Sequence, residues 1–378
     1  MSEWRTVELG EVINFKNGYA FKSADFIESG IPVIKIKNVK PNRVNLDDLS
    51  YVSESVAEGK ERYLIEPSDI LISMSGNRID GSPDSWVGKV SKFRLKGAYL
   101  LNQRVSIIQA RDGVSDPDFL AYSLSAWDTQ QYLVNHANSS GGQANISPDI
   151  VKAMEIVLPS LPEQKAIATV LSSFDDKIDL LSRQKKTLEA MAETLFRQWF
   201  VEDAQEAWDE GKVEDLFVLQ RGFDLPAQNR TDGPYPIYAA SGYSGGHSEY
   251  RVQGPGVTTG RSGLLGKVFF VLEDFWPLNT SLYVREFRRG TPLYSYFFLK
   301  TLDLNSFNAG SAVPTLNRNH VHEERVLIPP ADLIARFETT AFPLFQKIRQ
   351  NEKQIKGLER LRDTLLPKLM SGEVRVEV

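Results

Sequence analysis

The segment IVLPSLPEQKAIATVLSSFDDKIDLLSRQKKTLEAMAETLF, residues 156–196, decides the architecture of this chain because it occurs twice. Its second copy, VLIPPADLIARFETTAFPLFQKIRQNEKQIKGLERLRDTLL, lies at residues 326–366. A constant shift of 170 positions aligns the two copies without a gap and pairs, for example, Lys177 with Lys347. Chance would rarely preserve such a register, so the sequence predicts a tandem repeat.

Each copy carries a heptad pattern, in which apolar residues recur at alternating steps of four and three. That spacing is typical of a coiled-coil seam, so two long helices are predicted that pair with each other. Two helices buried separately in globular cores are the alternative. The predicted seam residues are Ile167, Leu171, Phe174, Ile178, Leu181, Leu188 and Leu195 in the first helix and Phe337, Leu344, Ile348, Ile355, Leu358 and Leu365 in the second.

Proline and glycine mark the ends of both predicted helices. Pro162 and Pro330 suit the opening turns, where a missing amide hydrogen costs little. Pro367, followed by Gly372, marks the end of the second helix. Pro343 lies inside the second pattern, and it is expected to kink that helix or to delay its regular start.

The segments that precede the helices also echo one another, more loosely. Gly88-Lys89-Val90 matches Gly266-Lys267-Val268, and Leu101-Asn102 matches Leu278-Asn279. Short runs rich in Val, Ile, Phe and Tyr, punctuated by Gly, Pro and Asn, predict strand-rich domains with a few short helices. The predicted fold class is α+β. Two mixed strand-rich domains, residues 1–158 and 206–328, alternate with two helical regions, residues 159–205 and 329–378; antiparallel pairing of the helices would relate the repeats by a pseudo-two-fold axis.

The composition is that of a globular protein, because 378 residues, 42% hydrophobic and 25% charged, suffice for two or three domains. No signal-peptide pattern and no membrane-spanning apolar run is found, so a cytoplasmic location is expected. The absence of cysteine excludes disulfides, thiol nucleophiles and cysteine-ligated zinc. His320 and His322 are expected on one face of a strand in a surface or packing role, and no metal site is predicted because no third ligand lies near them.

The stretch GRSGLLGKVFF, residues 260–270, looks at first like a phosphate-binding loop. Gly260 lies one residue too far from Gly266, however, and Val268 stands where a P-loop needs Ser or Thr. The residues that follow predict a strand rather than the helix that a P-loop opens. No adenine-methyltransferase tetrapeptide is found either, since DGPY at Asp232 has glycine at its second position. The sequence therefore contains neither a P-loop nor this methyltransferase motif.

A duplicated module on a helical spacer favours recognition of a two-part target. A helix over residues 162–200 would be about 58 Å long at roughly 1.5 Å per residue, and modules held that far apart fit DNA half-sites separated by one or more helical turns. Because the modules differ in sequence, the half-sites should differ too. The net charge of −5 indicates that DNA affinity would come from localised contacts. A scaffold that grips protein or glycan, and an enzyme with unrecognised catalytic residues, are the competing hypotheses.

The chain resembles the specificity subunit of type I restriction-modification systems over essentially its whole length. The resemblance rests on LPSLPEQKAIATVLSSFDDKIDLL (158–181), LFRQWFVE (195–202), LLPKLMSGEV (365–374) and LNQ (101–103). The second repeat departs from the pattern, with PPADLIARF where the first has LPEQKAIATV.

This resemblance implies two target-recognition domains, each reading one half of an asymmetric, bipartite double-stranded DNA site, and two helical regions that form an antiparallel coiled coil. It also implies docking of two modification (methyltransferase) subunits, which carry the S-adenosylmethionine site, and of restriction (translocase and nuclease) subunits in a system of phage defence. The chain itself is then expected to have no catalytic activity and no cofactor.

DNA contacts are expected in glycine-containing loops rich in Arg, Lys, Asn, Gln, Ser and Thr, because these side chains bond base edges or phosphates. For any single residue, an ordinary turn or solvent-facing role is an equal alternative. In the first domain the candidates are Ser75, Asn77, Arg78, Gln103, Arg104, Ser140, Gln143 and Asn145, with Lys35, Lys37 and Lys89 on phosphates. In the second they are Ser241, Tyr243, Thr259, Arg261, Ser262, Asn279, Thr315, Asn317 and Arg318.

Overall fold

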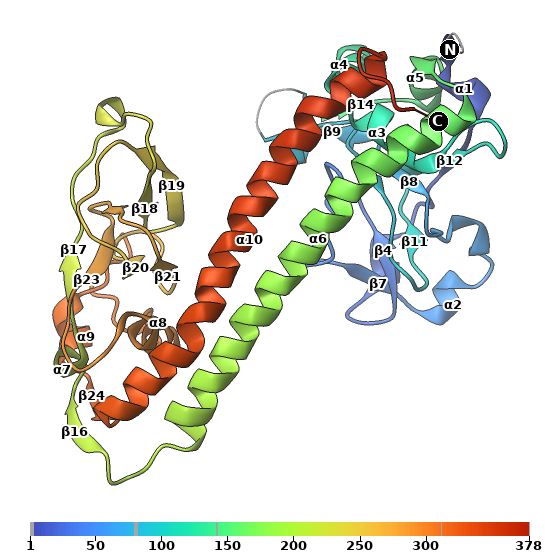
Figure 1. Ribbon diagram of the computed structural model, residues 1–378. Helices are drawn as coiled ribbons and strands as arrows, with labels where there is room; N and C mark the ends of the chain where they lie inside the picture. The colour runs from blue at the N-terminus through green and yellow to red at the C-terminus, as the bar shows by residue number, and fades with distance from the viewer. Residues whose placement is uncertain (1–3, 79–81, 141–142, 311, 378) are drawn as a thin grey trace. The chain divides into compact units, whose positions relative to one another are not determined.

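The computed structural model describes residues 4–78, 82–140, 143–310 and 312–377 (Figure 1). The chain divides into two compact units: unit 1 comprises residues 1–178 and 357–378, and unit 2 comprises residues 179–356. Each unit contains one strand-rich domain and a segment of each of two long helices, α6 (Leu161–Arg197) and α10 (Ala331–Ser371). The prediction of an α+β fold with two strand-rich domains and two long helices is confirmed.

Unit 1 is built from two four-stranded sheets, ordered β10-β8-β12-β2 and β11-β4-β7-β3, a three-stranded sheet β13-β14-β9, and the two-stranded ribbons β1-β15 and β5-β6. Its strands are β1 (Arg5–Glu8), β2 (Ile13–Asn17), β3 (Phe26–Ile27), β4 (Ile31–Ile34), β5 (Val39–Lys40), β6 (Arg43–Val44), β7 (Ser50–Val52), β8 (Ile70–Ser73), β9 (Ser75–Gly76), β10 (Val90–Lys92), β11 (Leu100–Leu101), β12 (Val105–Ala110), β13 (Asn138–Ser140), β14 (Gln143–Asn145) and β15 (Glu155–Leu158). Its short helices are α1 (Leu9–Val12), α2 (Glu54–Ala57), α3 (Pro117–Ser125), α4 (Trp127–His136) and α5 (Pro148–Lys152), with 3-10 turns η1 (Ser23–Asp25), η2 (Glu61–Tyr63) and η3 (Pro83–Ser85).

Unit 2 repeats this plan with a four-stranded sheet β17-β23-β20-β21, a three-stranded sheet β19-β18-β22 and the ribbon β16-β24. Its strands are β16 (Asp209–Lys212), β17 (Phe217–Arg221), β18 (Tyr235–Ala239), β19 (Gly242–His247), β20 (Gly256–Gly260), β21 (Val268–Val271), β22 (Trp276–Pro277), β23 (Ser281–Phe287) and β24 (Arg325–Ile328). Its short helices are α7 (Val213–Leu216), α8 (Pro292–Thr301) and α9 (Arg318–Glu323), with a 3-10 turn η5 (Ala227–Asn229) and a π-helical turn η4 (Gln198–Glu202) that extends α6.

The core of unit 1 forms where α3 covers the sheet that contains β8. Strand β8 lies between β10 and β12, so all of its residues are buried, and its apolar run is continuous instead of alternating. Helix α3 is capped by Asp116, whose Oδ1 accepts hydrogen bonds from two backbone amides of the first turn. Its residues Phe119 and Leu120 pack into the same core as Ile167 and Leu171 of α6.

The core of unit 2 is more aromatic. Phe297 of α8 stacks on Phe196 of α6, with ring centroids 5.5 Å apart, and meets the edge of Phe337 of α10 at 5.9 Å. Glu338 accepts from the hydroxyl of Thr291 and from the amide of Leu293, which satisfies the first turn of α8. Both long helices are therefore fastened to this domain.

Within each unit the segments of α6 and α10 run antiparallel. In unit 1, Asp175 pairs with Arg362 at 2.7 Å, while Glu163, earlier in α6, lies 3.5 Å from Arg375, beyond the end of α10. In unit 2, Gln184 bonds Asn351 at 2.8 Å, and the ring of Phe196 lies 5.7 Å from that of Phe337. The sequence numbers rise along one helix as they fall along the other.

The predicted seam residues all lie in the buried or half-buried part of these helices. Ile167, Leu171, Leu181 and Phe337 are buried, and the remaining nine are half-buried: Phe174, Ile178, Leu188, Leu195, Leu344, Ile348, Ile355, Leu358 and Leu365. Phe196, Ile334 and Phe345 are buried as well, although the heptad pattern leaves them out, because they face the domain of unit 2.

Two local expectations were wrong. Helix α10 runs from residue 331 to residue 371 and begins well before Pro343, so this proline does not delay its start; a kink at Pro343 stays a prediction. His320 and His322 lie in α9 and not in a strand. The Nε2 atom of His322 accepts a hydrogen bond from the backbone amide of Leu219 at 2.9 Å, and burial lowers the pKa of this imidazole, which favours the neutral form that accepts the bond.

Asn351 gives the first testable prediction. Its side chain is fully buried in the seam, and its Oδ1 atom has no hydrogen-bond partner among the described residues. The equivalent position in the first copy holds Leu181. We expect Asn351→Leu to raise the unfolding free energy of the chain by about 1 kcal/mol, because it removes an unsatisfied buried polar atom. The measurement is the Tm from calorimetry; Asn351→Ala, which leaves a cavity, should lower it, and a lower Tm for the leucine variant would contradict the prediction.

Candidate nucleic-acid interface

One edge of each unit is formed by the same pattern of backbone hydrogen bonds. In unit 1 the amide of Gly18 donates to the carbonyl of Val105 at 3.1 Å, and in unit 2 the amide of Gly222 donates to that of Ser281 at 3.0 Å. At both glycines an added Cβ would lie within 2.3 Å of a backbone oxygen, 2.0 Å at Gly18 and 2.3 Å at Gly222. Glycine is therefore required where β2 and β17 leave their sheets.

A second segment joins this edge in the same way in both units. The amide of Met74 donates to the carbonyl of Arg104 at 2.9 Å, and the amide of Arg261 donates to that of Thr280 at 2.8 Å. A third segment is hydrogen-bonded to the second in both units. The amide of Ile146 donates to the carbonyl of Met74, and the amide of Leu316 donates to the carbonyl of Arg261. We call the two surfaces edge 1 (Asn17, Gln103, Arg104 and Asn145, with the buried Ser75 beneath them) and edge 2 (Arg221, Asp224, Arg261, Ser262, Asn279 and Thr315).

The hydrogen bonds correct the alignment of the two copies by one residue. Leu101 pairs with Ile34 in β4, and Pro277 pairs with Tyr238 in β18, in equivalent registers. Leu101-Asn102 therefore corresponds to Pro277-Leu278 and not to Leu278-Asn279 as the sequence comparison predicted. The structural counterpart of Asn279 is Gln103.

Edge 1 brings together four of the predicted residues. The hydroxyl of Ser75 donates to Oδ1 of Asn145 at 2.6 Å, and the guanidinium of Arg104 lies 3.4 Å from both of these side-chain oxygens. Gln103 and Arg104 are exposed, while Ser75 is buried beneath them. The arrangement presents amide and guanidinium groups, which suit the acceptor and donor pattern of base edges.

Edge 2 also brings together four predicted residues. Nε of Arg261 donates to the carbonyl of Asn279 at 2.8 Å, which fixes the guanidinium plane. Ser262 and Thr315 lie opposite each other in an isolated antiparallel bridge. Partial burial, together with the positive charge of Arg221, lowers the pKa of the Arg261 guanidinium, while Asp224 acts in the opposite direction. Two guanidinium groups that lie close together favour a ligand rich in hydrogen-bond acceptors.

Sequence reasoning missed Asn17, Arg221 and Asp224. Asp224 accepts a short hydrogen bond from the side-chain amide of Asn279 and lies 3.6 Å from the guanidinium of Arg221. The only signal in the sequence is positional, because Arg221 precedes Gly222 as Asn17 precedes Gly18. That correspondence becomes visible only when the two hydrogen-bond frames are compared.

Three predicted contact residues have internal roles instead. Thr259 is fully buried, and its hydroxyl donates to the carbonyl of Lys267 at 2.7 Å. Lys89 is buried with its ammonium on the carbonyl of Asp84 at 2.9 Å, and burial, with Lys40 nearby, lowers its pKa to about 8. Ser75 is buried as well, so these three side chains support the surface from within.

Most of the other predicted residues lie apart from the hydrogen-bond networks of the two edges, but the carbonyl of Gln143 accepts from the side-chain amide of Asn145 at 3.4 Å. Lys35 lies over the ring of Phe26, with Nζ 3.4 Å from its centroid, and Lys37 pairs with Asp48. Asn317 caps α9 through its Oδ1 atom. Arg78 donates to the carbonyl of Ala137 at 3.0 Å. Exposed side chains are found at Asn77, Gln143, Ser241, Tyr243 and Arg318; Ser140 belongs to β13, but its side chain lies outside the described part of the structure.

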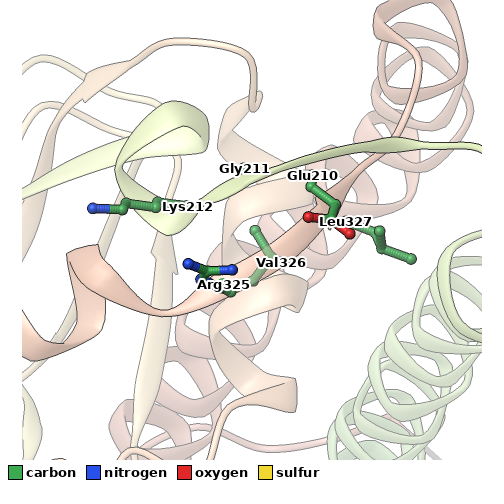
Figure 2. Close-up of a pocket in the computed structure, with 6 residues that line it drawn as sticks. All are labelled: Glu210, Gly211, Lys212, Arg325, Val326 and Leu327. Carbon is green, nitrogen blue, oxygen red and sulfur yellow. The ribbon is translucent and has the colours of Figure 1, made fainter.

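A cavity of about 410 Å³ lies elsewhere, on the ribbon of β16 and β24 (Figure 2). Its polar groups do not converge, because the ammonium of Lys212 points away from Glu210 in Figure 2, and Lys212 pairs with Glu323. In the described residues no group of three or more His, Asp or Glu is placed to hold a metal ion. Nor does any described helix combine the length and apolar composition needed to cross a membrane.

Comparison with known proteins now identifies the family. Residues 1–190 and 205–356 match the family model for the type I restriction modification DNA specificity domain. The chain belongs to this family. It is a specificity subunit of a type I restriction-modification system, a recognition component and not a catalytic one, and the resemblance seen in the sequence is confirmed.

Among relatives, the type I restriction enzyme MjaIX specificity subunit of Methanocaldococcus jannaschii is 25% identical over 328 residues, 75% of this chain and 74% of that one. The EcoBI specificity subunit of Escherichia coli is 28% identical over 205 residues, 52% of this chain and 37% of that one. The crystal structure of the S subunit of a type-I restriction-modification system from M. genitalium matches with a TM-score of 0.66 at 18% identity, covering 97% of this chain and 96% of that one. At that identity the likeness concerns the fold.

Proposed function

We propose that the specificity subunit reads a bipartite, asymmetric DNA site, with edge 1 reading one half and edge 2 the other. One observation carries the proposal: a single hydrogen-bond frame, present in both units, displays different polar side chains. Gln103, Arg104 and Asn145 stand in unit 1 where Asn279, Thr280 and Thr315 stand in unit 2. Base-edge recognition depends on the identity of such groups, so each unit has its own preference.

The subunit acts within a larger complex. We propose that it docks two modification subunits, which hold S-adenosylmethionine and methylate adenine, and restriction subunits with translocase and nuclease activity. Membership of the family supports this assignment. The chain's own part is recognition and scaffolding, and it needs no cofactor for that role.

The deciding experiment is expression of the chain with its cognate modification subunit in a host without this methylation, followed by methylome sequencing. The expected result is methylation at a two-part motif with an unspecified gap. Cells that express the modification subunit alone serve as the control. A contiguous motif, or methylation that does not depend on this chain, would overturn the proposal.

Arg261 gives a prediction for edge 2. We expect Arg261→Ala in the reconstituted complex to weaken binding to the cognate site by about 1–3 kcal/mol and to relax one base position, because a guanidinium held through Nε presents its two terminal nitrogens to a guanine edge. The measurement is a titration of cognate DNA and of single-base variants at fixed salt. Arg289→Ala, at the far end of the sheet, is the matched control. Unchanged affinity and unchanged base preference would remove Arg261 from the interface.

A further inference from the structure

Residues 17 and 221 occupy the same place in the two units. Asn17 is the last residue of β2 and Arg221 is the last residue of β17. Each is followed by a glycine that lies too close to a backbone oxygen to carry a side chain. Asn17 lies opposite Ser106 in β12, and Arg221 lies opposite Leu282 in β23. Both side chains are exposed. The shared pattern of backbone hydrogen bonds therefore places residues 17 and 221 at equivalent positions of the two units. Unit 1 has a side-chain amide there, and unit 2 has a guanidinium.

Each of the two side chains is held by a neighbour. Oδ1 of Asn17 accepts from the hydroxyl of Ser106 at 3.0 Å. In unit 2, Asp224 lies between Arg221 and Asn279, and Asn279 in turn holds Arg261 through its carbonyl. Arg221 is thus the outer member of a connected network that ends at Arg261. Such a network reduces the rotamer freedom that an exposed arginine would lose on binding.

The chemistry of these groups differs in a way that base edges distinguish. An arginine fork bonds the O6 and N7 acceptors of guanine, whereas an asparagine amide bonds the N7 acceptor and N6 donor of adenine. We infer that this equivalent position determines one base in each half-site: Arg221 reads a guanine for unit 2, and Asn17 reads an adenine for unit 1. Asp224 is a positioning residue for Arg221.

The inference rests on the proposed function, and it predicts an exchange of base preference. Arg221→Asn places the unit 1 residue in the unit 2 frame, so the guanine at one position of one half-site should be replaced by adenine. Asn17→Arg should change an adenine to a guanine at one position of the other half-site. In Arg221→Ala the same guanine position should become unspecified, with roughly a ten- to hundred-fold loss of discrimination.

The experiment is methylome sequencing of the complex of the full chain with its modification subunit, for the wild type, Arg221→Asn, Arg221→Ala, Arg221→Lys and Asn17→Arg. Arg221→Lys keeps the charge but loses the fork, so it should relax the guanine position while the rest of the motif stays intact. Arg289→Ala, which removes an exposed arginine paired with Asp209 at 2.8 Å, should leave the motif unchanged.

The outcomes separate this inference from the proposed function. If the wild type yields no two-part motif, the proposed function fails. If the wild type yields a two-part motif but Arg221→Asn and Arg221→Lys leave every base unchanged, the inference alone fails. A uniform fall in methylation in Arg221→Ala, with full activity and an intact motif in Arg221→Lys, would show a phosphate contact and would also overturn it.

Discussion

Phe337→Ala is expected to destabilise the chain by about 3–5 kcal/mol, the loss found when a fully buried aromatic side chain is truncated. Phe337 has no exposed surface, and its ring contacts the edges or faces of Phe196, Phe200 and Phe297 at centroid distances of 5.7, 5.4 and 5.9 Å. These rings come from α6, η4 and α8, so Phe337 joins both long helices to the domain of unit 2. Its removal leaves a cavity that rigid aromatic neighbours fill poorly.

The measurement for Phe337→Ala is calorimetric unfolding of the purified chain. Met191→Ala is the matched control, because Met191 is 49% exposed on α6 and its truncation should change the unfolding free energy by no more than about 0.5 kcal/mol. Phe337→Leu should lie between the two. A loss below about 1 kcal/mol for Phe337→Ala would mean that the aromatic cluster contributes little to the fold.

Arg362→Ala is expected to destabilise unit 1 by about 2–4 kcal/mol, because it removes one partner of a largely buried ion pair. The side chains of Arg362 and Asp175 are only 17% and 22% exposed, and their charged atoms lie 2.7 Å apart. The hydroxyl of Tyr122 donates to the other oxygen of Asp175 at 2.6 Å. Burial and this hydrogen bond raise the pKa of Tyr122, so the phenol stays protonated and brings no charge to Asp175, whose contacting cation is Arg362.

Two variants test that account of Arg362. Asp363→Ala removes the exposed partner of the same arginine and should cost about 0–1 kcal/mol, since that pair is open to solvent. The double variant Asp175→Asn with Arg362→Met should recover most of the lost stability, because no unpaired charge stays buried and the asparagine oxygen still accepts from the hydroxyl of Tyr122. If the double variant is as unstable as Arg362→Ala, packing and not charge is the cause.

The sequence located the helices well because their signal is local. A heptad pattern can be recognised from residues that are close together in the sequence. All the seam positions are buried or half-buried because they lie on the same face of their helix. The same signal could not separate contacts between helices from contacts with a domain. Phe337 belongs to the stripe, yet its ring contacts Phe297 of α8 as well as Phe196 of α6.

The sequence was less informative about edges 1 and 2, because polar residues that contact DNA and polar residues that support a turn are of the same types. Thr259 and Lys89 look like contact residues in the sequence, but they lie inside the structure. Asp224 looks like an ordinary loop residue, but it lies against Asn279, which is far away in the sequence. Such pairs form only after β17 and β23 have been aligned.

The sequence by itself determined that this protein is a tandem duplication with two long helices, since repetition and heptad spacing are written in the order of the residues. Its membership of the specificity-subunit family was indicated by the resemblance of particular segments, such as residues 158–181. The tertiary structure alone decided which side chains share an edge. Arg221 meets Asn279 and Arg261 because strands distant in the chain end together, and their registers are fixed by backbone hydrogen bonds that no residue pattern records. Those registers also place Asn17 and Arg221 at one equivalent position, on which the exchange of base preference depends.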